Sequence, residues 1–419
     1  MLKVILDILS TPAILVGLIA MTGLIVQKKP VSDIVKGTLK TVIGFMVLAG
    51  GAGIIVGALG YLGSIFQAGF KSQGVIPNNE AIVALALKTY GTRTALVMFF
   101  GMVVNIIIAR TTPLKYIFLT GHHILYMACL ISVILTACGL QGVLLIVVGA
   151  VLLGFVMAVF PALASPFMKK IIGSNDVALG HFGTTGYVIS ACVGKLVGKG
   201  SRSTEDISFP KTLGFLRDSS VSISLTMAVF FVFTAVVAGR VFIEKELSGG
   251  QNYIVFAIIQ AFTFAAGVYV VLQGVRLVIN EIVPAFVGIS EKFIPNAKPA
   301  LDCPVVFPYA PNAVMIGFIS SFIGGITGLV VCGYFSWTLI LPGIIPHFFC
   351  GGTAGVFGNA TGGVRGAVFG AFVQGLIITF APALLLPVLG ELGFANTTFG
   401  DTDFSVVGIL LAKAIKLFM

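Results

Sequence analysis

The apolar stretch Leu140–Phe160, LQGVLLIVVGAVLLGFVMAVF, carries no charged residue over a length that lets an α-helix cross the hydrocarbon core of a membrane. Of the 419 residues in the chain, 58% are hydrophobic and only 10% are charged, and the mean hydropathy is +1.10. Soluble domains carry about 25% charged residues, so this composition cannot cover a surface that faces water on all sides. We therefore predict an all-α polytopic membrane protein.

Similar apolar stretches elsewhere predict about eleven membrane crossings in total. They are Thr11–Val26, Thr38–Phe66, Thr94–Ala109, Tyr116–Cys138, Leu140–Phe160, Val221–Ile243, Tyr253–Val275, Ala313–Val331, Phe335–Phe349, Ala367–Leu389 and Phe404–Phe418. Residues 161–220 form a long, basic, polar-leaning stretch, which the positive-inside rule places on the cytoplasmic side together with the Lys28–Lys40 loop. The N-terminus is then expected outside and the C-terminus in the cytoplasm.

Several function classes are disfavoured. The net charge of +10 comes from lysines and arginines in short clusters between apolar runs, which is typical of loops beside lipid rather than of a nucleic-acid surface. The six cysteines form no CxxC pair, so we predict neither disulfides nor a metal site. The glycine-rich tract Gly351–Gly363 lacks the Gly-Lys-Ser/Thr of a Walker loop. We predict no cofactor. The first apolar run is followed by Gln-Lys-Lys, so we expect it to be retained as a span.

Two intervals of the chain resemble each other. One runs from Phe66 through Ile-Pro-Asn78 to Tyr90, and the other from Phe286 through Ile-Pro-Asn296 to Tyr309. We predict broken or re-entrant segments within an inverted repeat, because broken backbone at membrane depth must line a cavity or be buried in protein. Repeat one covers about residues 11–160 and repeat two about 221–389, within one transmembrane domain spanning 1–419. The alternative is that Ile-Pro-Asn recurs by chance.

Few charged or imidazole groups lie within the apolar segments, and each is costly there unless it has a function. His122, His181 and Asp302 are the candidates for solute binding, and we expect them to meet in one pocket near mid-membrane. The alternatives are a structural hydrogen bond for the histidines and an ion pair with a lysine for Asp302. His123 is a weaker candidate, because on a helix it points about 100° away from His122. A zinc site has no spacing motif in its favour.

Glycines can let backbone approach a ligand closely. For this reason we also select Thr353, Gly355 and Asn359 from the glycine-rich tract, together with Gly51, as candidates for solute binding.

The chain resembles the ascorbate-type permease component, enzyme IIC (EIIC), of the bacterial phosphoenolpyruvate-dependent phosphotransferase system, over nearly its whole length. The resemblance is carried by Ile34–Phe45, Leu119–His122, Gly180-His181, Gln273–Arg276, Leu301–Cys303 and Tyr309–Val314. It implies a homodimer in the bacterial inner membrane, with a core domain and an interleaved V-shaped scaffold of helices. It also implies that His122, His181 and Asp302 bind L-ascorbate or a related polar sugar acid.

The resemblance further implies that the chain is a transport subunit and not itself an enzyme. The solute is phosphorylated by a separate IIB protein bearing a phosphocysteine, which is charged by a IIA protein bearing a phosphohistidine. Two positions depart from the family, because Tyr126 and Phe182 stand where glutamines are expected. Tyr126 can still donate a hydrogen bond, whereas Phe182 can only stack. A threonine from the first broken segment has no certain counterpart around Ala81–Ile82.

Two other functions remain open from the residues alone. The chain could be a proton- or sodium-coupled secondary transporter of a small polar solute, with Asp302 and the histidines as a proton relay. It could also be a membrane scaffold without transport, although the broken, polar repeats argue against that function.

Overall fold

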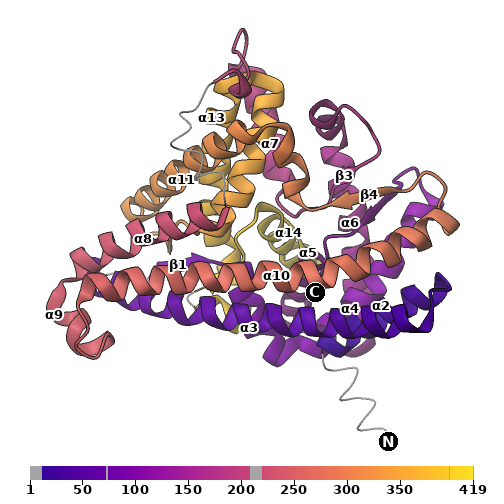
Figure 1. Ribbon diagram of the computed structural model, residues 1–419, viewed down its shortest axis with the longest axis horizontal. Helices are drawn as coiled ribbons and strands as arrows, with labels where there is room; N and C mark the ends of the chain where they lie inside the picture. The colour runs from indigo at the N-terminus through magenta and orange to yellow at the C-terminus, as the bar shows by residue number, and fades with distance from the viewer. Residues whose placement is uncertain (1–11, 72–73, 208–218, 396, 419) are drawn as a thin grey trace, which may run out of the picture.

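The structure is a computed structural model that describes residues 12–71, 74–207, 219–395 and 397–418 (Figure 1). The first part of the chain contains α2 (Pro12–Val26), α3 (Val31–Phe70), β1 (Gly74–Pro77), α4 (Asn79–Thr111), β2 (Tyr116–Phe118), α5 (Gly121–Ala137), α6 (Gly142–Ile172), β3 (Ala178–Leu179), α7 (Thr184–Val197) and the 3-10 turn η1 (Thr204–Asp206). The second part contains α8 (Ser219–Ala238), α9 (Arg240–Phe242), η3 (Ile243–Leu247), α10 (Tyr253–Phe293), β4 (Lys298–Leu301), η4 (Cys303–Tyr309), α11 (Pro311–Tyr334), β5 (Leu339–Ile340), α12 (Ile344–Pro346), η5 (His347–Gly351), α13 (Gly352–Leu385), η6 (Leu386–Val388), η7 (Gly390–Phe394), β6 (Thr397–Thr398) and α14 (Thr402–Phe418).

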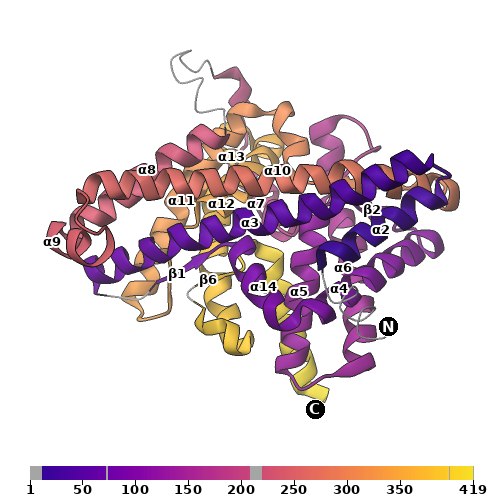
Figure 2. The same cartoon turned by 60° about the horizontal axis from the view of Figure 1, so that its bottom comes forward.

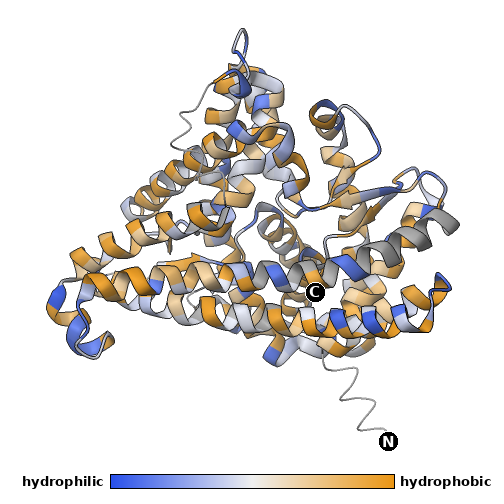
Figure 3. Ribbon diagram, viewed as in Figure 1, coloured by the Kyte–Doolittle hydropathy of each residue, from blue (hydrophilic) through white to orange (hydrophobic). Residues whose placement is uncertain are grey.

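Apolar helices account for most of the fold, as predicted (Figure 3). Among the described residues, six helices are long and apolar enough to cross a membrane, or seven if the pair bent by 100° at Gly239 forms one span. The expected count of about eleven is therefore not confirmed. On α6, Val147, Val151 and Phe155 recur every four residues with more than half of their surface exposed. Such an exposed apolar stripe is typical of a helix face that contacts lipid rather than water.

Some of the spans expected from the sequence have other bounds in the structure. The helix expected to end at Phe160 continues to Ile172 with Pro161 and Pro166 inside it, because neighbouring helices can satisfy the backbone groups that a proline frees. The polar stretch 161–220 is therefore not simply a loop. It holds the end of α6, then β3, α7 and η1, while residues 208–218 lie outside the described residues. The span expected at Phe335–Phe349 is instead broken into β5, α12 and η5, around Pro342 and Pro346.

The two longest helices, α3 with 40 residues and α10 with 41, run side by side along one side of the molecule (Figures 1 and 2). Helices α2 and α8 pack against them. The remaining helices form the rest of the body, where α13 packs against α7 and α11, and α4 against α5 and α6. The short strands lie among the helices of this body.

The order of elements repeats along the chain. The series α3-β1-α4-β2-α5-α6-β3-α7 is matched by α10-β4-α11-β5-α12-α13-β6-α14, in which α12 has only three residues where α5 has 17. Both intervals singled out by Ile-Pro-Asn are broken: α3 ends at Phe70 before β1, and α10 ends at Phe293 before β4. The prediction that neither interval is one straight helix is confirmed. The relation of the two series by a two-fold axis in the membrane plane stays a prediction.

The strands form two small parallel sheets, and each sheet combines strands from both series. The first has the order β5-β1-β6, with Val75 opposite Ile340 and Pro77 opposite Thr398. The second has the order β2-β4-β3, in which Ala300 lies opposite both Phe118 and Ala178. In each sheet the central strand follows one of the two long helices, and its neighbours come from the other half of the chain. The sheets therefore tie the two series together.

Candidate functional site

The β2-β4-β3 sheet brings three of the predicted solute-binding residues close together. Asp302 directly follows β4, His181 comes two residues after β3, and His122 comes four residues after β2. Because the three strands are parallel, their carboxyl ends lie at the same edge. His122 and Asp302 are 180 positions apart in the sequence, and the sheet brings them together.

Asp302 stands between the two histidines. Its Oδ2 lies 3.6 Å from His122 Nε2, and its Oδ1 lies 3.9 Å from His181 Nε2. Both distances are longer than a direct hydrogen bond. Each atom is therefore free to form a hydrogen bond with a group that lies between the side chains. The Asp302 side chain is 30% exposed, whereas those of His122 and His181 are 13% and 4% exposed. The predicted meeting of these three residues is thus observed, and their role in binding stays a prediction.

Local chemistry fixes each of these side chains. Gly180 lies so close to the backbone of Ala300 that a Cβ atom would collide with it, and its N–H donates to Leu301 O at 2.6 Å. Only glycine lets His181 approach β4 in this way. Asp302 Oδ1 accepts from Cys303 N at 2.7 Å and so caps η4. The Tyr187 hydroxyl lies 2.8 Å from His181 Nδ1 and orients that ring.

The other sheet delivers a second set of polar residues, which the sequence analysis did not select. Asn79 and Glu80 follow β1, and Asp401 follows β6 by three residues. Asn79 Nδ2 donates to Asp401 Oδ2 at 2.9 Å, and Asn79 Oδ1 accepts from Gly400 N at 2.8 Å. The Cys350 thiol donates to Asp401 Oδ1 at 3.1 Å. The sequence contained a signal for Glu80 and Asp401, because an acidic residue beside an apolar helix is a functional candidate by default.

His123 joins the two sets. Its ring centroid lies 3.9 Å from that of His181, and its Nε2 lies 3.9 Å from Asp401 Oδ2. Phe182 N donates to His123 Nδ1 at 3.3 Å, so the neutral ring carries its proton on Nε2 and points it toward Asp401. Three groups of histidine, aspartate and cysteine atoms here lie close enough to share a metal ion. A protonated Nε2 is a hydrogen-bond donor and not a metal ligand, so His123 does not suit the two groups that include it.

The two family departures have different surroundings. Tyr126 is buried, with its ring edge-on to His122 at 5.6 Å and its hydroxyl 3.4 Å from Glu80 Oε1. Phe182 is buried too, and its ring stacks on Phe118 at 4.8 Å. The ring of Phe182 therefore packs in the core, while its backbone N–H orients His123.

The glycine-rich tract contributes less than expected. Thr353 lies beside the Cys303 thiol and donates its hydroxyl to Phe349 O at 2.7 Å. Gly355 packs against Ala313 O. Asn359 Oδ1 accepts from Thr204 N at 2.9 Å, so it holds η1 instead of joining the histidines. Gly51 lies within α3, which is not among the elements that carry the cluster.

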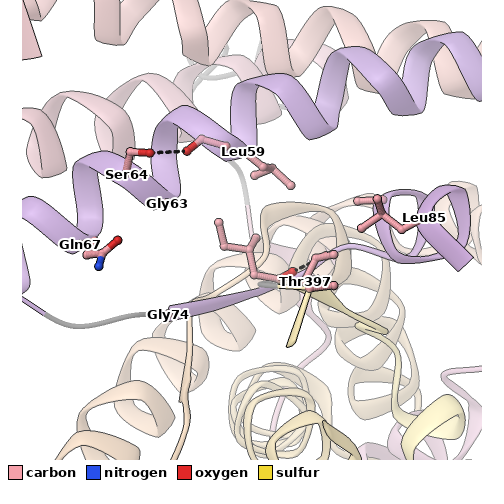
Figure 4. A pocket seen from close by; sticks show the side chains of 11 residues that line it. Leu59, Gly63, Ser64, Gln67, Gly74, Leu85 and Thr397 are labelled. Atoms are coloured by element: carbon pink, nitrogen blue, oxygen red, sulfur yellow. Dashed lines mark hydrogen bonds between the residues drawn. The ribbon is translucent and has the colours of Figure 1, made fainter. Parts of the chain in front are cut away.

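A cavity of about 240 Å³ lies on the other side of the first break (Figure 4). One wall is the face of α3 that presents Gly63, Ser64 and Gln67, and the opposite wall includes Gly74 and Thr397. Ala81 also lines it, next in sequence to Glu80. The turn from β1 into α4 therefore contributes to the wall of this cavity.

The electrostatics of the cluster are uneven. Asp302 and Asp401 each lie within 4.0 Å of histidine nitrogens. Within the described ranges of the chain, neither these aspartates nor Glu80 form an ion pair with lysine or arginine. Among the described residues, the basic groups within 4.0 Å of these aspartates are histidines.

The whole arrangement is that of a membrane protein with a cluster of polar side chains at broken segments. The profile of the family described as "PTS system sugar-specific permease component" matches residues 7–403. The chain belongs to this family. The permease is thus an integral membrane protein of the phosphotransferase system. The family is described as a permease component, which is a transport subunit.

A curated relative agrees with this assignment. The permease is 27% identical over 433 residues to the "Ascorbate-specific PTS system EIIC component" of Mycoplasma pneumoniae. The match covers 90% of this chain, and the chain spans 65% of the length of that relative. The resemblance identified from the sequence motifs is confirmed at the level of the family.

Proposed function

We propose that the permease binds L-ascorbate, or a related polar sugar acid, between Asp302 and the histidines and carries it into the cell. The observation that supports this most is the convergence of His122, His181 and Asp302 at the carboxyl ends of one parallel sheet. The likeness to an ascorbate-specific relative supports the choice of solute.

The proposed binding chemistry follows from the donors and acceptors. The Asp302 carboxylate accepts hydrogen bonds, and the imidazole Nε2 atoms of His122 and His181 donate or accept according to tautomer. The gaps of 3.6 and 3.9 Å leave each pair free to bond to a solute hydroxyl instead of to each other. A ring with several adjacent hydroxyl groups can satisfy all of these atoms at once.

We further propose that the solute is handed at the cytoplasmic face to a IIB protein bearing a phosphocysteine, which a phosphohistidine-bearing IIA protein recharges. The working unit would be a homodimer, in which a core moves against a scaffold that includes α3 and α10. The N-terminus would lie outside and the C-terminus in the cytoplasm, as the basic loops indicate.

Transport in vesicles tests this function. Vesicles that contain the permease alone should equilibrate labelled ascorbate slowly, whereas vesicles supplied with phosphorylated IIB should accumulate a phosphorylated product. Uptake of unphosphorylated solute against its gradient, driven by a proton or sodium gradient, would instead favour a secondary transporter. Vesicles that move other sugar acids but not ascorbate would keep the mechanism and change the solute.

A further inference from the structure

A second cavity, of about 610 Å³, lies between α3 and α8 on one side and α11 and β5 on the other. Five phenylalanines contribute to its wall, and Thr234 is the one polar side chain among the described residues that line it. The Thr234 hydroxyl donates to Phe230 O and Phe231 O, both at 2.9 Å, so its proton is already engaged. Apolar cavities stay dry and bind apolar molecules. A polar solute therefore finds few hydrogen-bond partners here, whereas a hydrocarbon chain fits.

The cavity opens onto apolar surface. Val229 and Phe233 on α8 line it and are 71% and 56% exposed, and Val330 on α11 lines it from the other side and is 66% exposed. On α11, Ile319 and Ile323 are exposed as well, and their helical spacing continues the face of Val330 away from the cavity. In a membrane protein such a face contacts lipid. The molecules that meet the opening are therefore acyl chains.

Cations stand at one end of this cavity. Phe70, in its wall, is the last residue of α3 and is followed by Lys71, which is exposed and forms no ion pair within the described residues. Gly69 approaches α8 so closely that a Cβ atom on it would come within 3.0 Å of Ala238 N. The exposed Arg240 comes two residues after Ala238, beyond the 100° bend. The ends of α3 and α8 thus bring two basic residues to the same end of the cavity.

Both basic residues can bind an anionic group. Arg240 pairs with Glu244 through Nε at 2.8 Å, which leaves its terminal N–H groups for another acceptor. The Lys71 ammonium is a compact charge on a flexible stem. An apolar cavity with cations at one end is complementary to a phospholipid, whose acyl chains are apolar and whose phosphate is anionic.

We propose that this cavity is a phospholipid site, in which one acyl chain lies between α8 and α11 and the phosphate contacts Lys71 and Arg240. The acyl chain supplies van der Waals contacts that an empty cavity would lack between these two parts of the molecule. The residues that line the cavity are not those of the histidine cluster. The inference therefore does not depend on which solute the permease carries.

Quenching by brominated acyl chains tests this proposal in the full-length permease. The chain has one tryptophan, which Trp337→Phe removes. Phe233→Trp then places a reporter in the cavity wall, and Phe155→Trp, at a position 53% exposed in the apolar stripe of α6, is the matched control for ordinary lipid contact. Purified protein in detergent micelles is titrated with phosphatidylglycerol that carries brominated chains.

We expect the reporter at position 233 to be quenched at a roughly 25-fold lower lipid concentration than the control, because each of two cations favours an anionic lipid about fivefold. Its quenching should also saturate, as binding to a site does. If Phe233→Trp does not give a monodisperse protein, Val330→Trp on the opposite wall takes its place.

Lys71→Gln tests the phosphate contact. It should raise the lipid concentration that half-quenches the reporter about fivefold. Lys28→Gln is the matched control, because Lys28 is also exposed and has a similar backbone conformation, with a φ of 59° against 52° for Lys71. Diacylglycerol with the same brominated chains lacks the phosphate, so its quenching should not respond to Lys71→Gln.

Three results would count against the site. Quenching at position 233 that rises in step with position 155 and does not saturate would overturn the proposal, because it is what ordinary lipid contact gives. Quenching at position 155 alone would overturn it in favour of a cavity covered by a second copy of the chain. Equal effects of Lys71→Gln and Lys28→Gln would contradict the phosphate contact.

Discussion

Asn79 donates from Nδ2 to Asp401 Oδ2 at 2.9 Å across 322 positions of the sequence, and both residues are buried. The same amide accepts from Gly400 N, so one side chain joins the first broken segment to the loop before the last helix. Asp401 in turn faces His123. This link therefore places the Asp401 carboxylate beside the histidine cluster.

The first prediction concerns the stability of this link. Asn79→Ala should lower the free energy of unfolding by about 1–3 kcal/mol, because it leaves Gly400 N and Asp401 Oδ2 without a partner. Asn79→Asp should cost more, since it places two carboxylates side by side. Unfolding in mixed detergent micelles measures both, with the exposed Gln251→Ala as control. Equal stability of all three variants would show that the link is not structural.

The second prediction concerns the proposed binding groups. His122→Ala and Asp302→Asn should each weaken ascorbate binding roughly 5- to 150-fold, because each removes one partner of a solute hydroxyl. Asparagine can still cap Cys303 N, so Asp302→Asn separates the loss of charge from loss of the η4 cap. Calorimetry on monodisperse protein measures the affinity. Unchanged affinity in both well-folded variants would place the binding site elsewhere.

The third prediction concerns the orientation of His181. Tyr187→Phe removes the hydroxyl 2.8 Å from His181 Nδ1 but keeps the buried ring that packs at 5.6 Å from it. We expect weaker ascorbate binding, by roughly 2- to 12-fold, which is the range for one neutral hydrogen bond of about 0.5–1.5 kcal/mol. Tyr61→Phe, on α3, is the matched control. A change in thermal midpoint with no change in affinity would mean that Tyr187 only packs.

The fourth prediction concerns close helix packing. A Cβ atom on Gly317 would collide with Gly351 O and would come within 2.7 Å of the Gly355 Cα, whereas one on Gly57 would meet nothing within 4 Å. Gly317→Ala should therefore destabilise the α11–α13 contact, and Gly57→Ala should be neutral or stabilising by up to about 1 kcal/mol. Thermal midpoints in detergent compare the pair. A neutral Gly317→Ala would mean that the two helices can move apart without cost.

Local chemistry in the sequence was enough for part of this picture. The low charge and the long apolar runs were enough to identify a membrane protein. Lipid favours apolar side chains and water favours polar ones, whatever the tertiary fold. The Ile-Pro-Asn steps marked both broken segments, because a proline disfavours an uninterrupted helix. His122, His181 and Asp302 were selected because a polar group in an apolar segment is costly on its own account.

Only the tertiary structure decided the rest. Helix α6 runs through Pro161 and Pro166 because of its neighbours, and Asn359 is taken up by η1 rather than by the cluster. Glu80 and Asp401 gain their place from the register of β1 with β6, which pairs Pro77 with Thr398. That pairing brings together residues 321 positions apart, and no local pattern specifies which distant strand a short strand will choose. His122, His181 and Asp302 could thus be selected from the sequence, whereas the placement of Glu80 and Asp401 near them depends on the fold.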